Sequence, residues 1–439
     1  MGRLSRYFLE RMPKVELHVH LEGAVPRPAL DELARKYGCP PFAALLDGIR
    51  RDDRGGGRGT RPRSLPAGEY GGNGTRSRFK FASGYGKARS PEIARGPCRR
   101  PCYRRPSFAD FIDVWLKIGE HLREYEDYAF AARALSADFK RQNILYAEVL
   151  FSPARDSTTH LQPDRITEAV AAGFAADPNG PTVLTRDLNT RLSTAEKAPA
   201  RVSSSPAGTA KPDPRKITGA PAAAPTAVRL IADFVRDNGP READRTLDAL
   251  LAMNDRRIAG IGLGGSEAPY PPAPFAPVFE KARASGLRTQ AHAGESDGPE
   301  SVWKSIRELR IDRIAHGVRA REDAALMIYL RQMELPLDIC PTSNIRTGAV
   351  ESMADHPAAD FLRRGLKVSL STDDPTLFGS DLAGEFDLLV RTFGLSEDEV
   401  RTLLLNAVDA AWCGAEEKKR LRAEILSFFS PPRREISRS

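Results

Sequence analysis

Two histidines, His18 and His20, stand one residue apart near the start of the chain, in the stretch KVELHVHLEG over residues 14–23. In an extended strand, alternate side chains share a face, so both imidazoles are expected on the same side of the backbone. Gly23 follows at once and lets the backbone turn sharply or approach a ligand closely. Such a pair can bind a divalent metal ion, although two histidines satisfied by hydrogen bonds would give the same pattern.

Further residues of metal-binding type follow other predicted strands. His292 and Glu295 bound the run HAGE, and His316 ends another strand. Asp373 and Asp374 stand together after the last one. Three histidines and one aspartate form a donor set suited to a divalent transition metal, zinc above all, with an open position for water. Bound zinc brings the pKa of water to roughly 7, which supplies hydroxide at neutral pH.

The acidic residues near these histidines divide naturally between two tasks. If Asp373 binds the metal, Asp374 is left free beside the bound water. Glu295 follows His292 by three residues and is placed to deliver a proton to a substrate rather than to bind metal. Taken singly, Glu295 could be an exposed loop carboxylate, and the aspartate pair could be a turn or a helix cap. Their joint occurrence at strand ends favours a metal-dependent hydrolase.

Histidines and cysteines elsewhere in the chain are interpreted as structural. His121, His160 and His356 fall on predicted helices or loops and are expected at the surface. Cys98 and Cys102 resemble half of a zinc knuckle, but no second Cys or His pair lies nearby. The five cysteines are odd in number and too few for a disulfide framework in a chain of this length.

The elements that would position the chemical residues alternate between strand and helix. Helices are predicted over 28–37, from Ser107 onward, and over 240–254, 275–285, 299–310, 322–333 and 357–364. Strands are predicted to end at His18-Val-His20 and to cover 145–151, 227–233, 258–263, 287–292, 313–316, 336–340 and 366–371. Eight strands alternating with helices favour a (β/α)8 TIM barrel over a doubly wound sheet. Catalytic groups in such barrels lie at the carboxyl ends of the strands, which is where these residues fall.

Two low-complexity insertions interrupt this pattern. Residues 50–106 are rich in Gly, Arg, Pro and Ser, and residues 177–226 are rich in Ala, Pro, Thr and Ser. Both contain too few periodic apolar residues to bury a core, so we predict disorder over 50–106 and a solvated loop or linker over 177–226. The chain is therefore interpreted as a single barrel over residues 1–439, and 50–106 is expected to be dispensable.

The net charge of +8 comes from one segment, because residues 50–106 hold 16 Lys or Arg against 4 Asp or Glu and the rest of the chain sums to −4. Nucleic-acid binding through this segment is the non-enzyme alternative, but its interleaved aromatic residues are few. A degenerate metal-binding protein is a second alternative. No signal peptide or membrane span is evident, so we expect a cytoplasmic protein.

Six short runs of residues together resemble the adenosine deaminase family, whose members are metal-dependent purine deaminases on a TIM barrel. The runs are HVHLEG at 18–23, GLGGSE at 262–267, HAGE at 292–295, RIAHG at 313–317, CPTSN at 340–344 and STDDP at 371–375. The resemblance covers most of the chain outside the two insertions. It does not extend to nucleic-acid deaminases, whose zinc is held by His-x-Glu and Pro-Cys-x-x-Cys, because Cys340-Pro341 has no partner cysteine.

The resemblance implies one zinc ion per chain and a small-molecule purine nucleoside as substrate. The implied ligands are His18, His20, His292 and Asp373, with His20 also lining the substrate side. Glu295 would protonate purine N1, and His316 would orient and stabilise the attacking hydroxide. Asp374 would hydrogen-bond the hydroxide and N7. The adduct would then expel ammonia and leave the 6-oxopurine.

The substrate contacts implied for the sugar and the base edge are less specific. Gly265 would offer its backbone N–H to N3, and Glu22, where many relatives carry Asp, would meet the ribose. The loop TSNIRTG at 342–348 resembles nucleoside deaminases, including those acting on 6-aminodeoxyfutalosine in menaquinone synthesis, more than adenine deaminases. Arg346 in that loop could pair with a substrate carboxylate or face solvent. Adenosine is the leading substrate, with aminodeoxyfutalosine and adenine as alternatives, and no oligomeric state follows.

Overall fold

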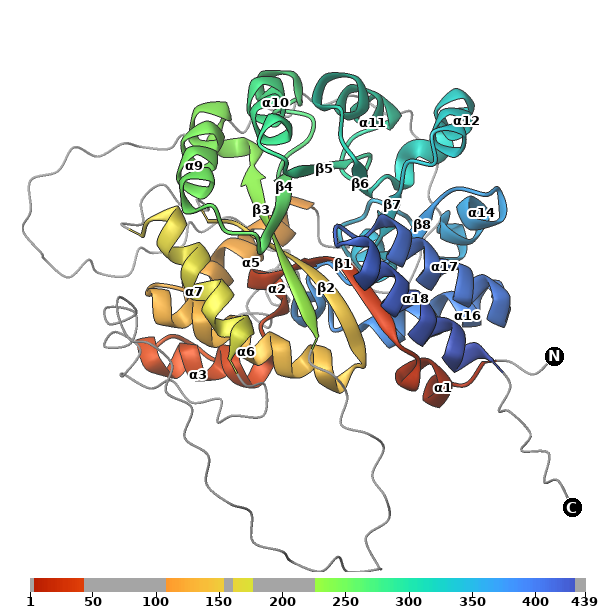
Figure 1. Ribbon diagram of the computed structural model, residues 1–439, viewed down its shortest axis with the longest axis horizontal. Helices are drawn as coiled ribbons and strands as arrows, with labels where there is room; N and C mark the ends of the chain where they lie inside the picture. The colour runs from red at the N-terminus through yellow and green to blue at the C-terminus, as the bar shows by residue number, and fades with distance from the viewer. Residues whose placement is uncertain (1–3, 43–107, 154–160, 177–225, 431–439) are drawn as a thin grey trace, which may run out of the picture.

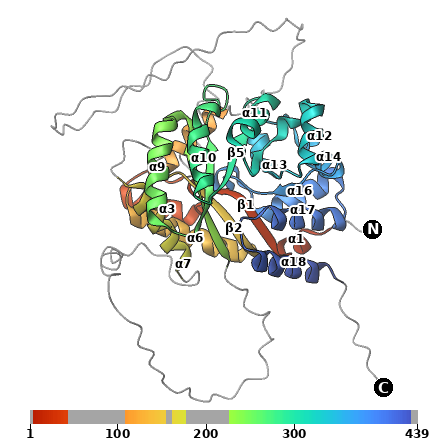
Figure 2. The ribbon, with the colours of Figure 1, turned by 45° about the horizontal axis from the view of Figure 1, so that its top comes forward.

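The computed structural model describes residues 4–42, 108–153, 161–176 and 226–430 (Figure 1). Eight parallel strands in chain order pair side by side in one sheet, with their helices arranged around it. Figure 2 shows the same ring of helices after a 45° turn. The predicted TIM barrel is confirmed. The insertions predicted at 50–106 and 177–226 lie outside the described residues except for Thr226, and so do His160 and the pair Cys98 and Cys102.

The strands agree with the predicted ranges to within about two residues at most ends. They are β1 (Lys14–His20), β2 (Ile144–Phe151), β3 (Ala227–Val235), β4 (Ile258–Gly264), β5 (Arg288–Ala293), β6 (Arg313–His316), β7 (Leu337–Ile339) and β8 (Val368–Leu370). The barrel closes between its first and last strands through a parallel bridge joining Val19 and Asp373. There the N–H of His20 donates to the carbonyl of Asp373 at 2.8 Å, and the N–H of Asp373 donates to the carbonyl of His18 at 3.0 Å. The closing bonds therefore involve residues of the predicted metal site.

The longer helices surround the barrel, whereas the short helices that directly follow β1, β7 and β8 lie at its carboxyl end. The helices are α1 (Arg6–Arg11), α2 (Leu21–Ala24), α3 (Arg27–Tyr37), α5 (Phe108–Gly119), α6 (Tyr125–Arg141), α7 (Pro163–Ala175), α9 (Pro240–Met253), α10 (Ala276–Ala284), α11 (Pro299–Lys304), α12 (Ala324–Gln332), α13 (Pro341–Arg346), α14 (Ala358–Arg363), α15 (Pro375–Phe378), α16 (Leu382–Phe393), α17 (Glu397–Ala410) and α18 (Ala415–Phe429). The predicted loop at 342–348 is largely helix α13 instead. Pro341 begins it with a φ suited to the first helical turn, and the N–H of Asn344 donates to the carbonyl of Cys340 at 2.9 Å.

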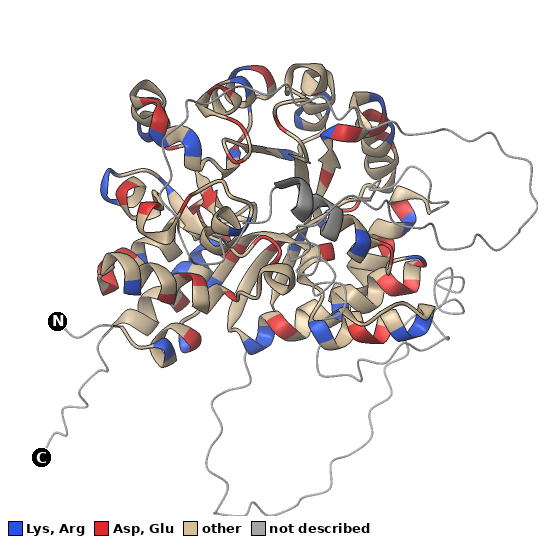
Figure 3. Ribbon diagram, turned by 180° about the vertical axis from the view of Figure 1, so that it is seen from behind, with Lys and Arg blue, Asp and Glu red and all other residues tan. Residues whose placement is uncertain are grey.

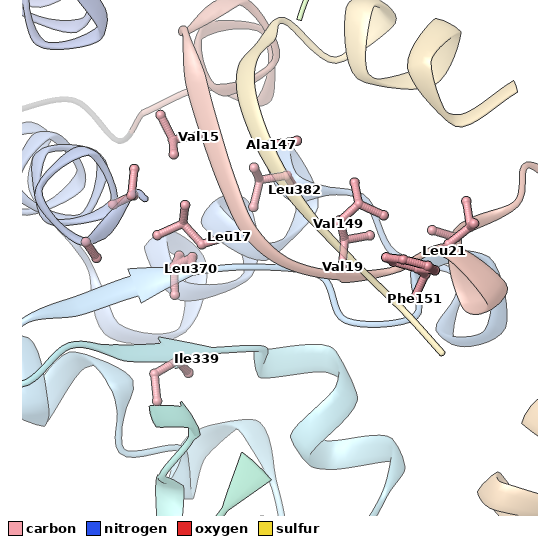
Figure 4. Packing of buried hydrophobic residues seen from close by; sticks show 14 of the residues in the cluster. Val15, Leu17, Val19, Leu21, Ala147, Val149, Phe151, Ile339, Leu370 and Leu382 are labelled. Carbon is pink, nitrogen blue, oxygen red and sulfur yellow. The ribbon is translucent and has the colours of Figure 1, made fainter. Parts of the chain in front are cut away.

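Strand β1 is buried along its whole length and separates two environments. Its apolar side chains, including Val15, Leu17 and Val19, pack with Leu370 and Leu382 in the hydrophobic core (Figure 4). The alternate residues, which include both histidines, face the other way, as the pleat of a strand requires. The same strand thus anchors the barrel wall and presents the site.

The barrel interior below the site is polar and contains two buried ion pairs. Arg313 on β6 is fully buried, and its Nη2 lies 2.6 Å from Oε2 of Glu148. Its Nε lies 2.8 Å from Oδ2 of Asp338 on β7. A buried charge is tolerated only when it is paired in this way. The network ties β2, β6 and β7 together beneath the predicted catalytic residues.

Charges of both signs are interspersed over the outer helices (Figure 3). Many form exposed pairs such as Arg391 with Asp387 in α16, at 2.9 Å, and pairs of this kind contribute at most about 1 kcal/mol each. The basic run at 50–106, on which the nucleic-acid alternative depends, lies outside the described part of the chain. Among the helices that the structure describes, none is long and apolar enough to cross a membrane.

Candidate metal and catalytic site

The structure brings the four predicted metal ligands together at the carboxyl end of the barrel. His18 and His20 end β1, and their Nε2 atoms lie 3.2 and 3.3 Å from Oδ1 of Asp373, which follows β8. His292 on β5 reaches the same point, with its ring centroid 4.8 Å from that of His18 and 5.2 Å from that of His20. Two histidines of one strand, a third from across the barrel and a carboxylate therefore converge.

The chemical state of these groups suits a metal ion. Burial lowers the pKa of His20 to about 3 and lowers that of His292 well below its ordinary value, so both rings are neutral and carry the lone pairs that a metal requires. Burial raises the pKa of Asp373, but its hydrogen bond with His18 and the attraction of the histidine cluster outweigh burial and hold the pKa well below the ordinary value. Nε2 of His292 is buried with no hydrogen-bond partner among the described residues.

His316 lies within the same cluster. One nitrogen of His316 falls within 4.8 Å of ligand atoms of both His18 and Asp373, so distance alone does not separate it from the metal ligands. Both His316 and Asp373 have φ of +65°, a left-handed conformation that is uncommon outside glycine. Such strain persists only where the surrounding structure imposes it, and it clusters at functional sites.

Ser343, in α13, completes the surroundings of Asp373. Its hydroxyl donates to Oδ2 of Asp373 at 2.6 Å, while Oδ1 faces the histidines. One carboxylate oxygen of Asp373 is thus fixed by Ser343, and the other is directed toward the histidines. Ser343 belongs to the run CPTSN at 340–344, but no role for it was predicted from the sequence.

Asp374 depends on Gly23 for its place. A Cβ on Gly23 would lie 1.7 Å from Oδ1 of Asp374, so only glycine allows the two segments to approach this closely. Oδ1 of Asp374 is buried and has no hydrogen-bond partner within the described residues. Burial and the neighbouring carboxylates of Asp373 and Glu22 raise the pKa of Asp374 well above its ordinary value.

Glu295 is buried, only 5% exposed, so the alternative of an exposed loop carboxylate is wrong. Burial, the largest cause, and the nearby charge of Asp373 raise its pKa to about 7, although His316 acts in the opposite direction. Its Oε2 lies 3.5 Å from Nε2 of His316. A carboxyl group with a pKa near neutrality can exchange a proton at pH 7.

Glu267 holds the segment that carries Glu295, and sequence reasoning missed it. Its carboxylate accepts the backbone N–H of Gly294 at 2.8 Å, of Glu295 at 2.9 Å and of Ser296 at 2.8 Å. It also accepts the hydroxyl of Ser301. Its place in the run GLGGSE was the only signal, because the partners lie 27 to 34 residues further along the chain.

The residues predicted to meet the sugar and the base edge lie around the same site. Glu22 is buried, and its Oε1 accepts the N–H of Ser152 at 2.9 Å. Gly265 has φ of +89°, and a Cβ there would lie 2.4 Å from Oδ2 of Asp237, so glycine is required. A further buried carboxylate, that of Asp233 on β3, was not anticipated from the sequence.

Comparison with known proteins identifies the family. The family model described as adenosine deaminase matches residues 215–428. The aminodeoxyfutalosine deaminase of Streptomyces avermitilis is 31% identical over 431 residues, which covers 97% of this chain and 94% of that protein. The chain belongs to the adenosine deaminase family.

Two further proteins are similar to this member of the adenosine deaminase family. The adenine deaminase of Bordetella parapertussis is 30% identical over 407 residues, covering 93% of this chain and 99% of that protein. A crystal structure of an amidohydrolase from Burkholderia ambifaria with bound zinc has a TM-score of 0.68 at 22% identity, covering 98% of this chain and 94% of that one. That likeness shows the shared fold.

Two of the histidines outside the cluster were placed wrongly by the sequence analysis of this deaminase family member. His121 and His356 were predicted at the surface and are buried, 5% and 3% exposed. Nδ1 of His121 lies 3.2 Å from the carbonyl of Ile118 at the end of α5, which satisfies it locally. His356 packs against Asn344 behind the site. Arg346, in contrast, is exposed at the end of α13.

Proposed function

We propose that this chain is a zinc-dependent deaminase that converts a 6-aminopurine nucleoside and water into the 6-oxopurine nucleoside and ammonia. The observation that carries the proposal is the buried carboxyl of Glu295, with a pKa raised to about 7, beside a converging set of histidines and one aspartate. Such a set can serve hydrolysis, and the carboxyl beside it can serve proton transfer.

The proposed zinc ligands are His18, His20, His292 and Asp373. Three imidazole nitrogens and one carboxylate oxygen match the donors that catalytic zinc takes, leaving a position for water. When bound, the metal lowers the pKa of water and so supplies the nucleophile. The zinc of the Burkholderia ambifaria neighbour supports this identity at the level of the fold.

Glu295 is the proposed general acid. A purine ring accepts a nucleophile at C6 more readily when N1 carries a proton, because C6 is then more electrophilic. The protonated carboxyl of Glu295 can donate to N1, and its pKa of about 7 leaves a large protonated fraction at neutral pH. The hydrogen bonds from the backbone N–H groups of residues 294–296 to Glu267 keep the carboxyl of Glu295 in position.

His316 and Asp374 are the proposed groups for orienting the attacking oxygen. Both present buried polar atoms that have no hydrogen-bond partner among the described residues, Nε2 of His316 and Oδ1 of Asp374. Unsatisfied buried groups cost about 1–3 kcal/mol each, so a bound substrate or water that pairs with them is favoured. Asp374 would also meet N7 of the purine.

The sugar side of the substrate would meet Glu22, and the N–H of Gly265 would meet N3. Adenosine is the leading candidate, and poor activity on free adenine is expected because a buried carboxylate would lose its hydroxyl partner. Aminodeoxyfutalosine is the second candidate, supported by the near full-length match to the Streptomyces avermitilis enzyme.

The test compares kcat/KM for adenosine, aminodeoxyfutalosine and adenine, with ammonia release as the readout. Glu295→Gln, assayed in parallel, is the control for a contaminating deaminase, because it should lose turnover with every substrate. We expect one of the two nucleosides to give the highest kcat/KM. Adenine as the best substrate would overturn the proposed sugar requirement, and no ammonia from any of the three would overturn the deaminase assignment.

A further inference from the structure

A chain of hydrogen bonds runs outward from His316 to the protein backbone. Nδ1 of His316 lies 3.1 Å from Nδ2 of Asn344, and Oδ1 of Asn344 lies 3.3 Å from Nε2 of His356. On its other side, Nδ1 of His356 accepts the backbone N–H of Ala358 at 3.2 Å. The three side chains are buried, so their hydrogen bonds must be made with one another.

The backbone N–H of Ala358 determines which atom donates and which accepts in every hydrogen bond of this series. The backbone N–H of Ala358 can only donate, so Nδ1 of His356 carries a lone pair. Burial, helped by the charge of Arg321, lowers the pKa of His356 to about 3, so the ring is neutral and its hydrogen is on Nε2. That hydrogen is donated to Oδ1 of Asn344.

The side-chain amide of Asn344 in turn determines which nitrogen of His316 accepts a hydrogen bond. With Oδ1 turned toward His356, the NH2 group faces His316 and donates to its Nδ1. Nδ1 of His316 therefore holds a lone pair, and the hydrogen of the ring lies on Nε2. Which ring nitrogen of a histidine carries hydrogen is set by the bond that the other nitrogen makes.

We propose that Asn344 and His356 are positioning residues that hold His316 as a hydrogen-bond donor through Nε2 toward the reacting groups. Nε2 of His316 is buried, has no hydrogen-bond partner among the described residues, and lies 3.5 Å from Oε2 of Glu295. A nitrogen that bears hydrogen cannot bind a metal. These hydrogen bonds thus distinguish His316 from the three histidines proposed to bind the metal. They leave Nε2 of His316 to donate to the attacking oxygen, a role that rests on the proposed deaminase function.

Both positioning residues are themselves held by the backbone. The N–H of Asn344 donates to the carbonyl of Cys340 at 2.9 Å, and the carbonyl of Asn344 accepts the N–H of Val350 at 2.8 Å. The N–H of His356 donates to the carbonyl of Met353 at 3.2 Å. These backbone hydrogen bonds fix the positions from which the side chains of Asn344 and His356 reach one another. The segment 340–358 therefore sets the orientation of the His316 ring.

The test reads the hydrogen directly, by ¹⁵N NMR of the ring nitrogens of His316 in the full-length, metal-loaded protein. The signals are assigned by their loss in His316→Gln. We expect Nε2 of His316 to carry hydrogen in the unaltered protein and in His356→Gln, whose side-chain N–H can still reach Asn344. Asn344→Asp replaces the donor by an acceptor of the same shape and should move the hydrogen to Nδ1.

Kinetics and metal content separate positioning from a structural role. Asn344→Asp and His356→Leu should lower kcat by about 10–100-fold, the range for partners that orient an imidazole at a metal centre, with little change in KM or metal content. His356→Gln should restore most of kcat. Asn406→Asp is the matched control, because it makes the same change at another buried asparagine. Nδ2 of Asn406 donates to the carbonyl of Val368 at 3.0 Å and takes no part in the hydrogen bonds to His316.

Hydrogen on Nδ1 of His316 in the unaltered protein would overturn the proposal, as would an unchanged kcat and an unmoved hydrogen in Asn344→Asp. If Asn344→Asp fails to fold, the pair His356→Leu and His356→Gln decides by the same readouts. The NMR result does not depend on turnover, so failure of the deaminase assignment would appear as absent ammonia release with the hydrogen still on Nε2.

Discussion

Gly23→Ala tests the close approach on which the placement of Asp374 depends. The added Cβ would lie 1.7 Å from Oδ1, 2.4 Å from Cγ and 2.5 Å from Cβ of Asp374. Rotating the carboxylate relieves only the first two contacts, because the Cβ of Asp374 moves only with its backbone. Overpacking of this kind costs about 1–3 kcal/mol of stability. A displacement of a reacting group by about 1 Å can cost on the order of 10²-fold in kcat.

Steady-state ammonia release and thermal unfolding are the assays for this variant. Gly414→Ala is the control, because a Cβ at Gly414 meets nothing within 4 Å and its φ of −67° suits alanine. We expect Gly23→Ala to fold with a lowered Tm and to lose at least tenfold in kcat, while Gly414→Ala matches the unaltered protein. Full activity and unchanged Tm in Gly23→Ala would refute the position assigned to Asp374.

Four further outcomes are expected. Glu295→Gln should lower kcat by about 10²–10⁴-fold while sparing ground-state binding, because proton delivery is needed only in the transition state; an unchanged kcat would contradict the assigned acid. For the same reason kcat/KM should fall as pH rises through about 7, the raised pKa of Glu295, and a profile flat from pH 5 to 9 would count against it. Glu16 accepts the N–H of Thr372 in the barrel interior, and burial raises its pKa from 4.5 to about 8. The folded state must therefore keep a proton that the unfolded state releases, and stability from this group is lost as pH rises between those values. The Tm of Glu16→Gln relative to the unaltered protein should accordingly increase over that range, and a pH-independent difference would show that Glu16 does not titrate this way. Shortening residues 50–106 should leave ammonia release and metal content intact, since every proposed site residue lies outside the segment; loss of metal on deletion would contradict this.

The barrel could be predicted because its signals are local. Strands such as β2 and β3 are short, mainly apolar runs, and helices such as α3 end at a glycine in the left-handed conformation, here Gly38 with φ of +66°. The convergence of the proposed metal ligands could be predicted for a related reason. In a barrel, the carboxyl ends of all strands meet at one face, so His18 and Asp373 converge although they are far apart in sequence.

The residues that were missed act through contacts between distant segments. Glu267 carries an ordinary surface-type side chain, and only the fold shows that three backbone N–H groups surround it. His356 follows a short helical turn with no apolar pattern, so nothing near it in the sequence predicts its burial against Asn344. Local periodicity reports secondary structure, whereas these roles arise from tertiary packing.

The most direct test of a metal-dependent purine deaminase is elemental analysis and ammonia release on the same purified sample. One zinc ion per chain is expected, together with turnover of adenosine or aminodeoxyfutalosine that a chelator abolishes and added zinc restores. Asp373→Ala should lose metal and turnover together, because one carboxylate oxygen of Asp373 faces the histidines at 3.2 and 3.3 Å. Full turnover in protein that holds no stoichiometric transition metal would contradict the assignment.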